Sequence, residues 1–144
     1  MVATTGAQLL PHDAVQTLIS ELLPVTTILT PNISEAQLLA KAAEKPYGDI
    51  RSLDDMKKVA KIIASLGPKY VLLKGGHLPL TTDGVIANGE ADRDVIVNVL
   101  YGVDQTWVFE TEYLGSKNTH GTGCSLACKH NTIEIQKLLS LTIS

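Results

Sequence analysis

The sequence predicts one α/β domain built around a mostly parallel sheet, and three observations support that prediction. A chain of 144 residues with 44% apolar content has the size and composition of a single globular domain. Segments with helical spacing of apolar residues alternate with short runs of β-branched residues, as in parallel α/β sheets. Glycine and proline separate these segments, and no internal repeat or low-complexity tract interrupts them.

The first helix and strand are expected before residue 32. Apolar residues from Val15 to Leu22 recur at offsets of three and four, which predicts a helix over 13–23 that Pro24 ends. The following segment, 25–30, is rich in β-branched residues and stops at a proline, so it is expected to be a short buried strand.

Two further helices carry recognisable start signals. Ser34 followed by Gln37 has the pattern of a capping box, which predicts a helix directly after the first strand. Ser52 followed by Asp55 repeats the signal, an apolar stripe follows, and Gly67 with its following proline predicts the stop.

The remaining strands are expected in the second half of the chain. Residues 70–73 read as a strand that runs into a glycine turn at 74–77, where the chain and a ligand can approach closely. Between 95 and 110, two apolar, β-rich segments flank residues 103–105, which predicts a hairpin or a pair of edge strands.

Charge and cysteine content exclude several classes of function. A net charge of -3 gives no general attraction to nucleic acid or to an anionic membrane surface. The only two cysteines, Cys124 and Cys128, offer no disulfide framework and suit the reducing cytoplasm. No apolar run approaches the roughly 20 residues that span a bilayer, so a soluble protein is expected.

A glycine-bearing loop from Lys117 to Cys124 is the first candidate for chemistry. The Gly-x-Gly turn at its end, Gly121 to Gly123, can direct successive backbone N–H groups toward an anion at a helix N-terminus. Cys124 would lie in the first turn, where the helix dipole lowers a thiol pKa. The alternatives are ordinary loop geometry for the glycines and a small buried apolar role for the cysteine.

Three side chains after predicted strands form the second candidate. Asn32 and Glu35, at N-x-x-E spacing, could organise a hydrated Mg²⁺, although helix capping explains the same pair locally. Lys74 ends a strand beside two glycines and could reach a phosphate as a point charge; a snorkelling surface lysine is the alternative. The G-x-x-x-x-G-K-[ST] pattern of P-loop kinases is absent from the sequence.

Four motifs together resemble a known family. In order and spacing, MVATTGAQLL, TPNISEA, VLLKGGH and NTHGTGCSLA resemble the second half of the hydroxymethylpyrimidine and phosphomethylpyrimidine kinases of thiamine biosynthesis, over residues 1–127. NTHGTGC is the most specific motif, because most relatives in the ribokinase-like superfamily have aspartate where Cys124 stands. Some pyridoxal kinases share the cysteine. The resemblance implies a ribokinase-like three-layer sandwich, incomplete at both ends.

The resemblance also implies a reaction and the residues that perform it. ATP with Mg²⁺ would phosphorylate the hydroxymethyl group of the pyrimidine, and then the resulting monophosphate. The implied roles are an anion hole at Gly121, Thr122 and Gly123, a catalytic base at Cys124, phosphate or nucleotide contacts at Lys74, Asn118 and Thr119, and Mg²⁺ organisation at Asn32 and Glu35.

The sequence also departs from this family. Relatives have a strand and a pyrimidine pocket before the stretch that matches Met1, and a small-residue helix where this chain has a divergent tail. We therefore expect a partial kinase domain at 1–128, a tail at 129–144, and an isolated chain that is inactive or severely impaired. Uncovered apolar surface in such a chain favours a partner, including self-association into a homo-oligomer.

Two other classes of function compete with the kinase reading. One is a small metal-binding module, because His120, Cys124, Cys128 and His130 supply nitrogen and sulfur ligands within a short stretch. Gly121 and Gly123 argue against the continuous helix that this arrangement would need. The other is a non-catalytic fragment that folds or binds a partner.

Overall fold

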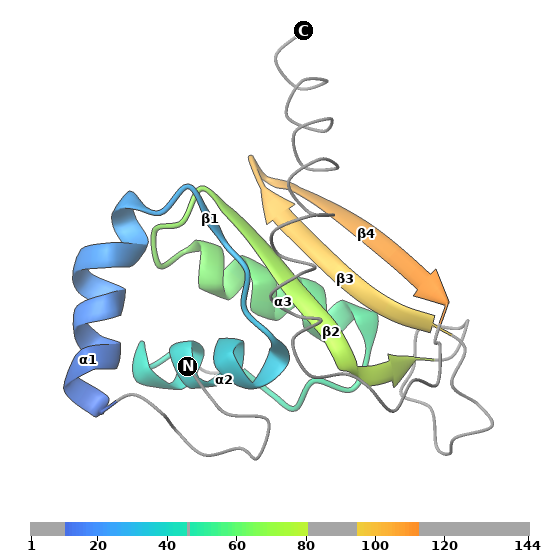
Figure 1. The fold of residues 1–144 in the computed structure, drawn as a ribbon, viewed down its shortest axis with the longest axis horizontal. Coiled ribbons are helices and arrows are strands. Elements are labelled where there is room, and N and C mark those ends of the chain that lie inside the picture. Colours follow the sequence, from blue (N-terminus) through green and yellow to red (C-terminus); the bar gives the residue numbers. More distant parts are fainter. Residues whose placement is uncertain (1–10, 46, 81–94, 113–144) are drawn as a thin grey trace, which may run out of the picture. The chain divides into compact units, whose positions relative to one another are not determined.

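The computed structural model describes residues 11–45, 47–80 and 95–112, which all fall within the unit Met1–Tyr113. In chain order the elements are α1 (His12–Thr17), a π-helical turn η1 (Leu18–Leu22), a 3₁₀ turn η2 (Leu23–Val25), β1 (Ile28–Leu29), α2 (Ile33–Ala42), α3 (Leu53–Ala64), β2 (Tyr70–Leu80), β3 (Val95–Gly102) and β4 (Gln105–Glu112) (Figure 1). Helices and strands are therefore interspersed, as expected for an α/β protein, although α2 and α3 follow each other with no strand between them. No helix among these residues is long and apolar enough to cross a membrane.

The four strands form one sheet in the order β1-β2-β3-β4. Strand β1 pairs parallel to β2, whereas β2 with β3 and β3 with β4 are antiparallel. The prediction of a mostly parallel sheet is therefore wrong for the described residues, and the sheet is mixed. The physical reason is the hairpin of β3 and β4, since a two-residue turn can join only antiparallel strands.

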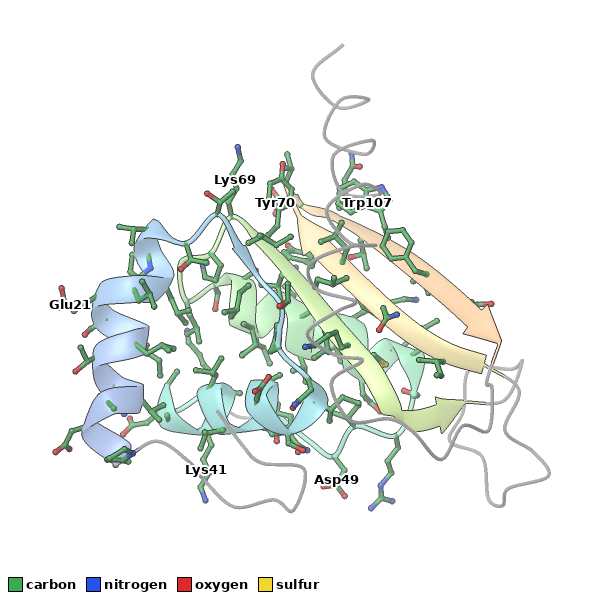
Figure 2. All side chains as sticks on the ribbon, in the orientation of Figure 1. Glu21, Lys41, Asp49, Lys69, Tyr70 and Trp107 are labelled. Carbon is green, nitrogen blue, oxygen red and sulfur yellow. The ribbon has the colours of Figure 1, made fainter. Side chains whose placement is uncertain are left out.

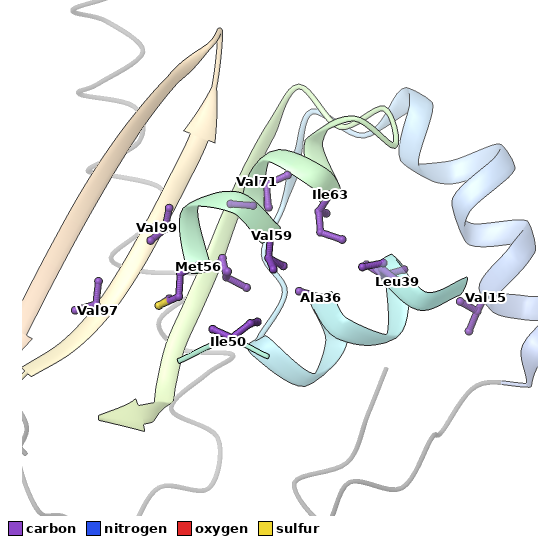
Figure 3. Close-up of a cluster of buried hydrophobic side chains, with 13 residues drawn as sticks. Val15, Ala36, Leu39, Ile50, Met56, Val59, Ile63, Val71, Val97 and Val99 are labelled. Carbon is purple, nitrogen blue, oxygen red and sulfur yellow. The ribbon is translucent and has the colours of Figure 1, made fainter. Parts of the chain in front are cut away.

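Helices α2 and α3 pack on the sheet through one apolar face. Alternation along the strands turns Val71 of β2 and Val97 and Val99 of β3 toward α3 (Figure 3). The buried side chains that α3 adds are Met56, Val59, Ala60 and Ile63. This cluster anchors β2, the strand that carries Lys74 at the far end of its buried run.

The start and end of α3 follow the sequence signals. The Ser52 side chain accepts a hydrogen bond from the Asp55 N–H at 3.2 Å, which confirms the predicted cap. Hydrogen bonds from the Arg51 N–H and the Ser52 hydroxyl lower the pKa of the Asp55 carboxyl. This stabilisation is present above the ordinary carboxyl pKa of 3.8 and is lost as the pH falls through the lowered pKa of the folded state. Gly67 then ends the helix region with a positive φ of 129°.

The first predicted helix and strand are both shorter than the sequence indicates. The α-helix ends at Thr17 and continues as the π and 3₁₀ turns, so Leu22 is 55% exposed instead of buried. Val25 closes the 3₁₀ turn and is 76% exposed, which leaves only Ile28–Leu29 as strand. The turn forms because the Thr26 N–H donates to the Leu23 carbonyl and the Thr26 hydroxyl donates to the Leu22 carbonyl.

The β3–β4 hairpin confirms the first of the two readings of residues 95–110. Gly102 pairs with Gln105 across a two-residue turn, Val103 and Asp104, whose φ angles are 51° and 56°. Two positive φ angles are typical of a type I′ turn, which favours asparagine and glycine. A β-branched valine at such a position is strained.

Replacing Val103 with asparagine should stabilise the protein. Val103 is 54% exposed, so little apolar burial is lost, and asparagine tolerates the left-handed conformation. We expect the free energy of unfolding to rise by about 1 kcal/mol in urea denaturation. The control is Val25→Asn, at another exposed valine, which should give no such gain. A Val103→Asn variant no more stable than the wild type would contradict the turn assignment.

Candidate functional site

The carboxyl end of β1 lies beside Lys74, in the middle of β2, and the two form the candidate site. The Lys74 N–H donates to the Pro31 carbonyl at 2.9 Å, and Asn32 forms a parallel bridge with Lys74 just beyond β1. Parallel strands place their carboxyl ends at one edge of a sheet, which is where ligands bind in α/β proteins. The structure therefore brings together three of the predicted site residues: Asn32, Lys74 and, through α2, Glu35.

Asn32 and Glu35 form a reciprocal capping box at the start of α2. The Asn32 Oδ1 accepts from the Glu35 N–H at 2.8 Å, and the Glu35 Oε2 accepts from the Asn32 N–H at 3.0 Å. The prediction that Ser34 caps this helix with Gln37 is wrong, because the helix already begins at Ile33. The bridge to Lys74 holds Asn32 extended, in the conformation that a cap residue requires.

The donor set at this edge is compatible with a hydrated magnesium ion. The capping box uses Asn32 Oδ1 and one carboxylate oxygen of Glu35, so the second oxygen, Oε1, can accept from a metal-bound water. Mg²⁺ prefers oxygen ligands and keeps several waters in proteins. Among the residues that the structure describes, no group of three or more His, Cys, Asp or Glu side chains could hold a metal directly. The residues thus suit an ion held through water and substrate phosphate.

Lys74 is half-buried in the middle of β2, and the turn predicted at 74–77 is wrong, because the strand continues through these residues to Leu80. The next residue is packed tightly, because a Cβ on Gly75 would lie 2.1 Å from the Val97 carbonyl oxygen. The Gly75 N–H donates to the Asn98 Oδ1 at 3.2 Å. The sequence analysis missed Asn98, although a single amide side chain within the apolar run VIVNVL is a signal that could have identified it.

A small pocket opens beside Glu35 on the side of α1. It has a volume of about 210 Å³ and its lining residues are Val15, Leu18, Leu29, Thr30, Pro31, Glu35, Leu38 and Leu39. A larger pocket of about 510 Å³, between the loop at Tyr47 and the outer face of α3, shares no residue with the candidate site. The small pocket is therefore adjacent to the end of β1 and to Glu35.

The glycine loop and its cysteine lie outside the described residues. This applies to Asn118, Thr119, Gly121, Thr122, Gly123 and Cys124, and to the alternative metal ligands His120, Cys128 and His130. The anion hole, the catalytic base and the domain boundary at 128 remain predictions. The structure places only the Asn32, Glu35 and Lys74 part of the predicted site.

Comparison with known proteins decides the family. The phosphomethylpyrimidine kinase family matches residues 1–133 of this chain. The chain belongs to that family. Its relatives include the hydroxymethylpyrimidine/phosphomethylpyrimidine kinase of Synechococcus elongatus, which is 38% identical over 133 residues, 88% of this chain and 41% of the relative.

Solved structures related to the phosphomethylpyrimidine kinase family show a similar fold. The phosphomethylpyrimidine kinase of Clostridium difficile matches with a TM-score of 0.58 and 31% identity, over 94% of this chain and 54% of that one. The pyridoxal kinase of Staphylococcus aureus in complex with AMP-PCP matches with a TM-score of 0.64 and 28% identity, over 88% of this chain and 40% of that one. The chain thus spans about half or less of each of these relatives.

Two substitutions at Glu35 should test its capping role. Glutamine also completes a capping box, so Glu35→Gln should keep the free energy of unfolding within about 0.5 kcal/mol of the wild type. Alanine removes the acceptor for the Asn32 N–H, so Glu35→Ala should lower the free energy of unfolding by about 1 kcal/mol. Urea denaturation measures both values. Equal stability of the two variants would show that the reciprocal bond contributes nothing.

Proposed function

We propose that this chain is the phosphate-handling part of an ATP-dependent kinase that phosphorylates hydroxymethylpyrimidine, and then its monophosphate, in thiamine biosynthesis. The observation that carries the proposal is the placement of Lys74 beside Asn32 and Glu35 at one edge of the sheet. Membership of the phosphomethylpyrimidine kinase family supports the substrate class. The full three-layer ribokinase-like sandwich belongs to the same proposal.

Lys74 supplies positive charge to the phosphates in this proposal. Phosphoryl transfer depends mainly on positioning and on neutralising charge that spreads over the transferred group. A half-buried lysine within a strand meets both needs, because its backbone is held by the Pro31 carbonyl. The N-terminus of α2 adds a partial positive charge at the same edge.

Asn32 and Glu35 would hold Mg²⁺ through its waters. The ion, when bound, neutralises charge on the nucleotide phosphates. The capping box keeps both side chains in fixed positions, so Oε1 of Glu35, the carboxylate oxygen that the box does not use, needs no reorganisation when the nucleotide arrives. A cytoplasmic location is part of the proposal and rests on the cysteine usage alone.

The loop from Asn118 to Cys124 would complete the site. In the proposed step, Cys124 as thiolate takes the proton of the hydroxymethyl group while that oxygen forms a bond to the γ-phosphorus of ATP. The bond from the γ-phosphorus to the bridging oxygen breaks, and ADP leaves. The N–H groups of Gly121, Thr122 and Gly123 stabilise the charge that develops on the phosphoryl oxygens.

A pyridoxal kinase-like activity is the second candidate, because the solved structures that match this chain include pyridoxal kinases. The two candidates share the phosphate site and differ in the acceptor. An assay with hydroxymethylpyrimidine and pyridoxal in parallel separates them.

Loss of Lys74 should abolish most phosphoryl transfer. With γ-labelled ATP and Mg²⁺, we expect the purified chain to label hydroxymethylpyrimidine slowly, and Lys74→Ala to lower that rate by about 100-fold. The matched control is Lys69→Ala, since Lys69 is exposed directly before the start of the same strand (Figure 2) and should leave the rate within about twofold. Equal rates for the two variants would contradict the role of Lys74, and preferred labelling of pyridoxal would favour the second candidate.

A further inference from the structure

We infer that Asn98 is a positioning residue that fixes the Lys74–Gly75 end of β2 and thereby directs Lys74 toward the nucleotide phosphates. The inference rests on the proposed phosphate role of Lys74. Asn98 is the register partner of Lys74 in the antiparallel pairing of β2 with β3. Direct partners in such a pair lie on the same face of the sheet, so Asn98 and Lys74 are neighbours.

The pairing of the two strands is interrupted immediately after Lys74. Lys74 pairs with Asn98, and the register resumes only where Pro79 pairs with Ile96. Residues 75–78 of β2 thus face the single residue Val97 of β3, which makes a large irregular bulge. A bulge of this kind disrupts the ladder locally and leaves the extra residues without regular backbone partners.

The Asn98 side chain replaces the missing ladder contact at the first residue of the bulge. Its Oδ1 accepts from the Gly75 N–H at 3.2 Å, in a half-buried position. The absence of a side chain on Gly75 allows this approach, because a Cβ would meet the Val97 carbonyl oxygen. Valines on either side of Asn98 are buried in the core, so β3 holds the amide on a rigid support.

Lys74 is consequently held from two strands. Its own N–H is bound to the Pro31 carbonyl of the β1 end, and the next N–H along the chain is bound to Asn98 of β3. Together the two bonds fix the backbone on both sides of the Lys74 Cα, which sets the direction of its side chain. An acceptor oxygen at position 98 is required for this, and an apolar side chain cannot provide it.

Three variants test the role of Asn98: Asn98→Ala removes the acceptor, Asn98→Asp keeps one, and Val99→Ala weakens the same strand on the opposite face. Hydrogen exchange of the Gly75 amide, followed by NMR, measures the protection that the hydrogen bond to Asn98 gives, and it needs no nucleotide. Calorimetric titration with AMP-PCP and Mg²⁺ reads the consequence for phosphate binding. Thermal unfolding of each variant records the general loss of stability.

We expect Asn98→Ala to speed Gly75 exchange by about tenfold or more and to weaken AMP-PCP binding by about tenfold. Asn98→Asp should keep the Gly75 protection and bind AMP-PCP more tightly than Asn98→Ala does. Val99→Ala should lower the unfolding temperature while leaving the affinity within about twofold.

An unchanged exchange rate of the Gly75 amide in Asn98→Ala would overturn the inference about Asn98 but not the proposed phosphate role of Lys74. So would a Val99→Ala variant that loses as much affinity as Asn98→Ala, because the effect would then follow from stability. A wild-type chain that binds no AMP-PCP while its Gly75 amide depends on Asn98 overturns the proposed phosphate role of Lys74, and the functional half of the inference with it.

Discussion

The parallel attachment of β1 to β2 is the contact on which the rest of the site depends. Strand β1 is only two residues long, yet hydrogen bonds extend its attachment beyond both ends. The Lys69 and Tyr70 N–H groups donate to the Thr26 and Thr27 carbonyls, and the Lys74 N–H donates to the Pro31 carbonyl. Because the last bond lies next to the cap of α2, it places the helix N-terminus beside Lys74.

The hydrophobic core explains why a strand as short as β1 can place the N-terminus of α2 beside Lys74. Helix α3 packs against β2 and β3 through residues such as Met56 and Ile63, so the core holds β2 independently of its contacts with β1. Each fully buried side chain of this kind contributes roughly 1.5–3 kcal/mol to stability. The site is then built from groups just beyond the core, where the buried run of β2 gives way to Lys74 and to the glycines after it.

Elements with strong local signals could be predicted from the sequence. The helix capped by Ser52, the strand from Tyr70 and the hairpin at Val103 all combine periodic apolar residues with turn or cap residues. The sequence could not show that Leu22 and Val25 turn outward, because β-branched and apolar residues near Pro24 suit a strand, a helix or a 3₁₀ turn equally well. The antiparallel direction of β3 relative to β2 likewise depends on tertiary pairing.

The candidate site likewise has features that could be predicted from the sequence and features that could not. Asn32, Glu35 and Lys74 could be identified from spacing and strand ends, but the choice of Asn32 over Ser34 as the cap follows from its bridge to Lys74, a contact between residues 42 positions apart. Asn98 became recognisable only when the strand register placed it opposite Lys74. Long-range pairing, which local sequence does not encode, therefore decides which polar residues meet.

The location of the phosphate site is tested most directly by mapping where a nucleotide binds. In an NMR titration of the chain with AMP-PCP and Mg²⁺, we expect the largest amide shifts among the described residues at Asn32, Glu35, Lys74 and Gly75. Amides at the start of β2 and just before it, such as Lys69, should shift little. Shifts concentrated there, or around the loop at Tyr47, would contradict the assignment of the phosphate site to the carboxyl end of β1 and the neighbouring Lys74 of β2.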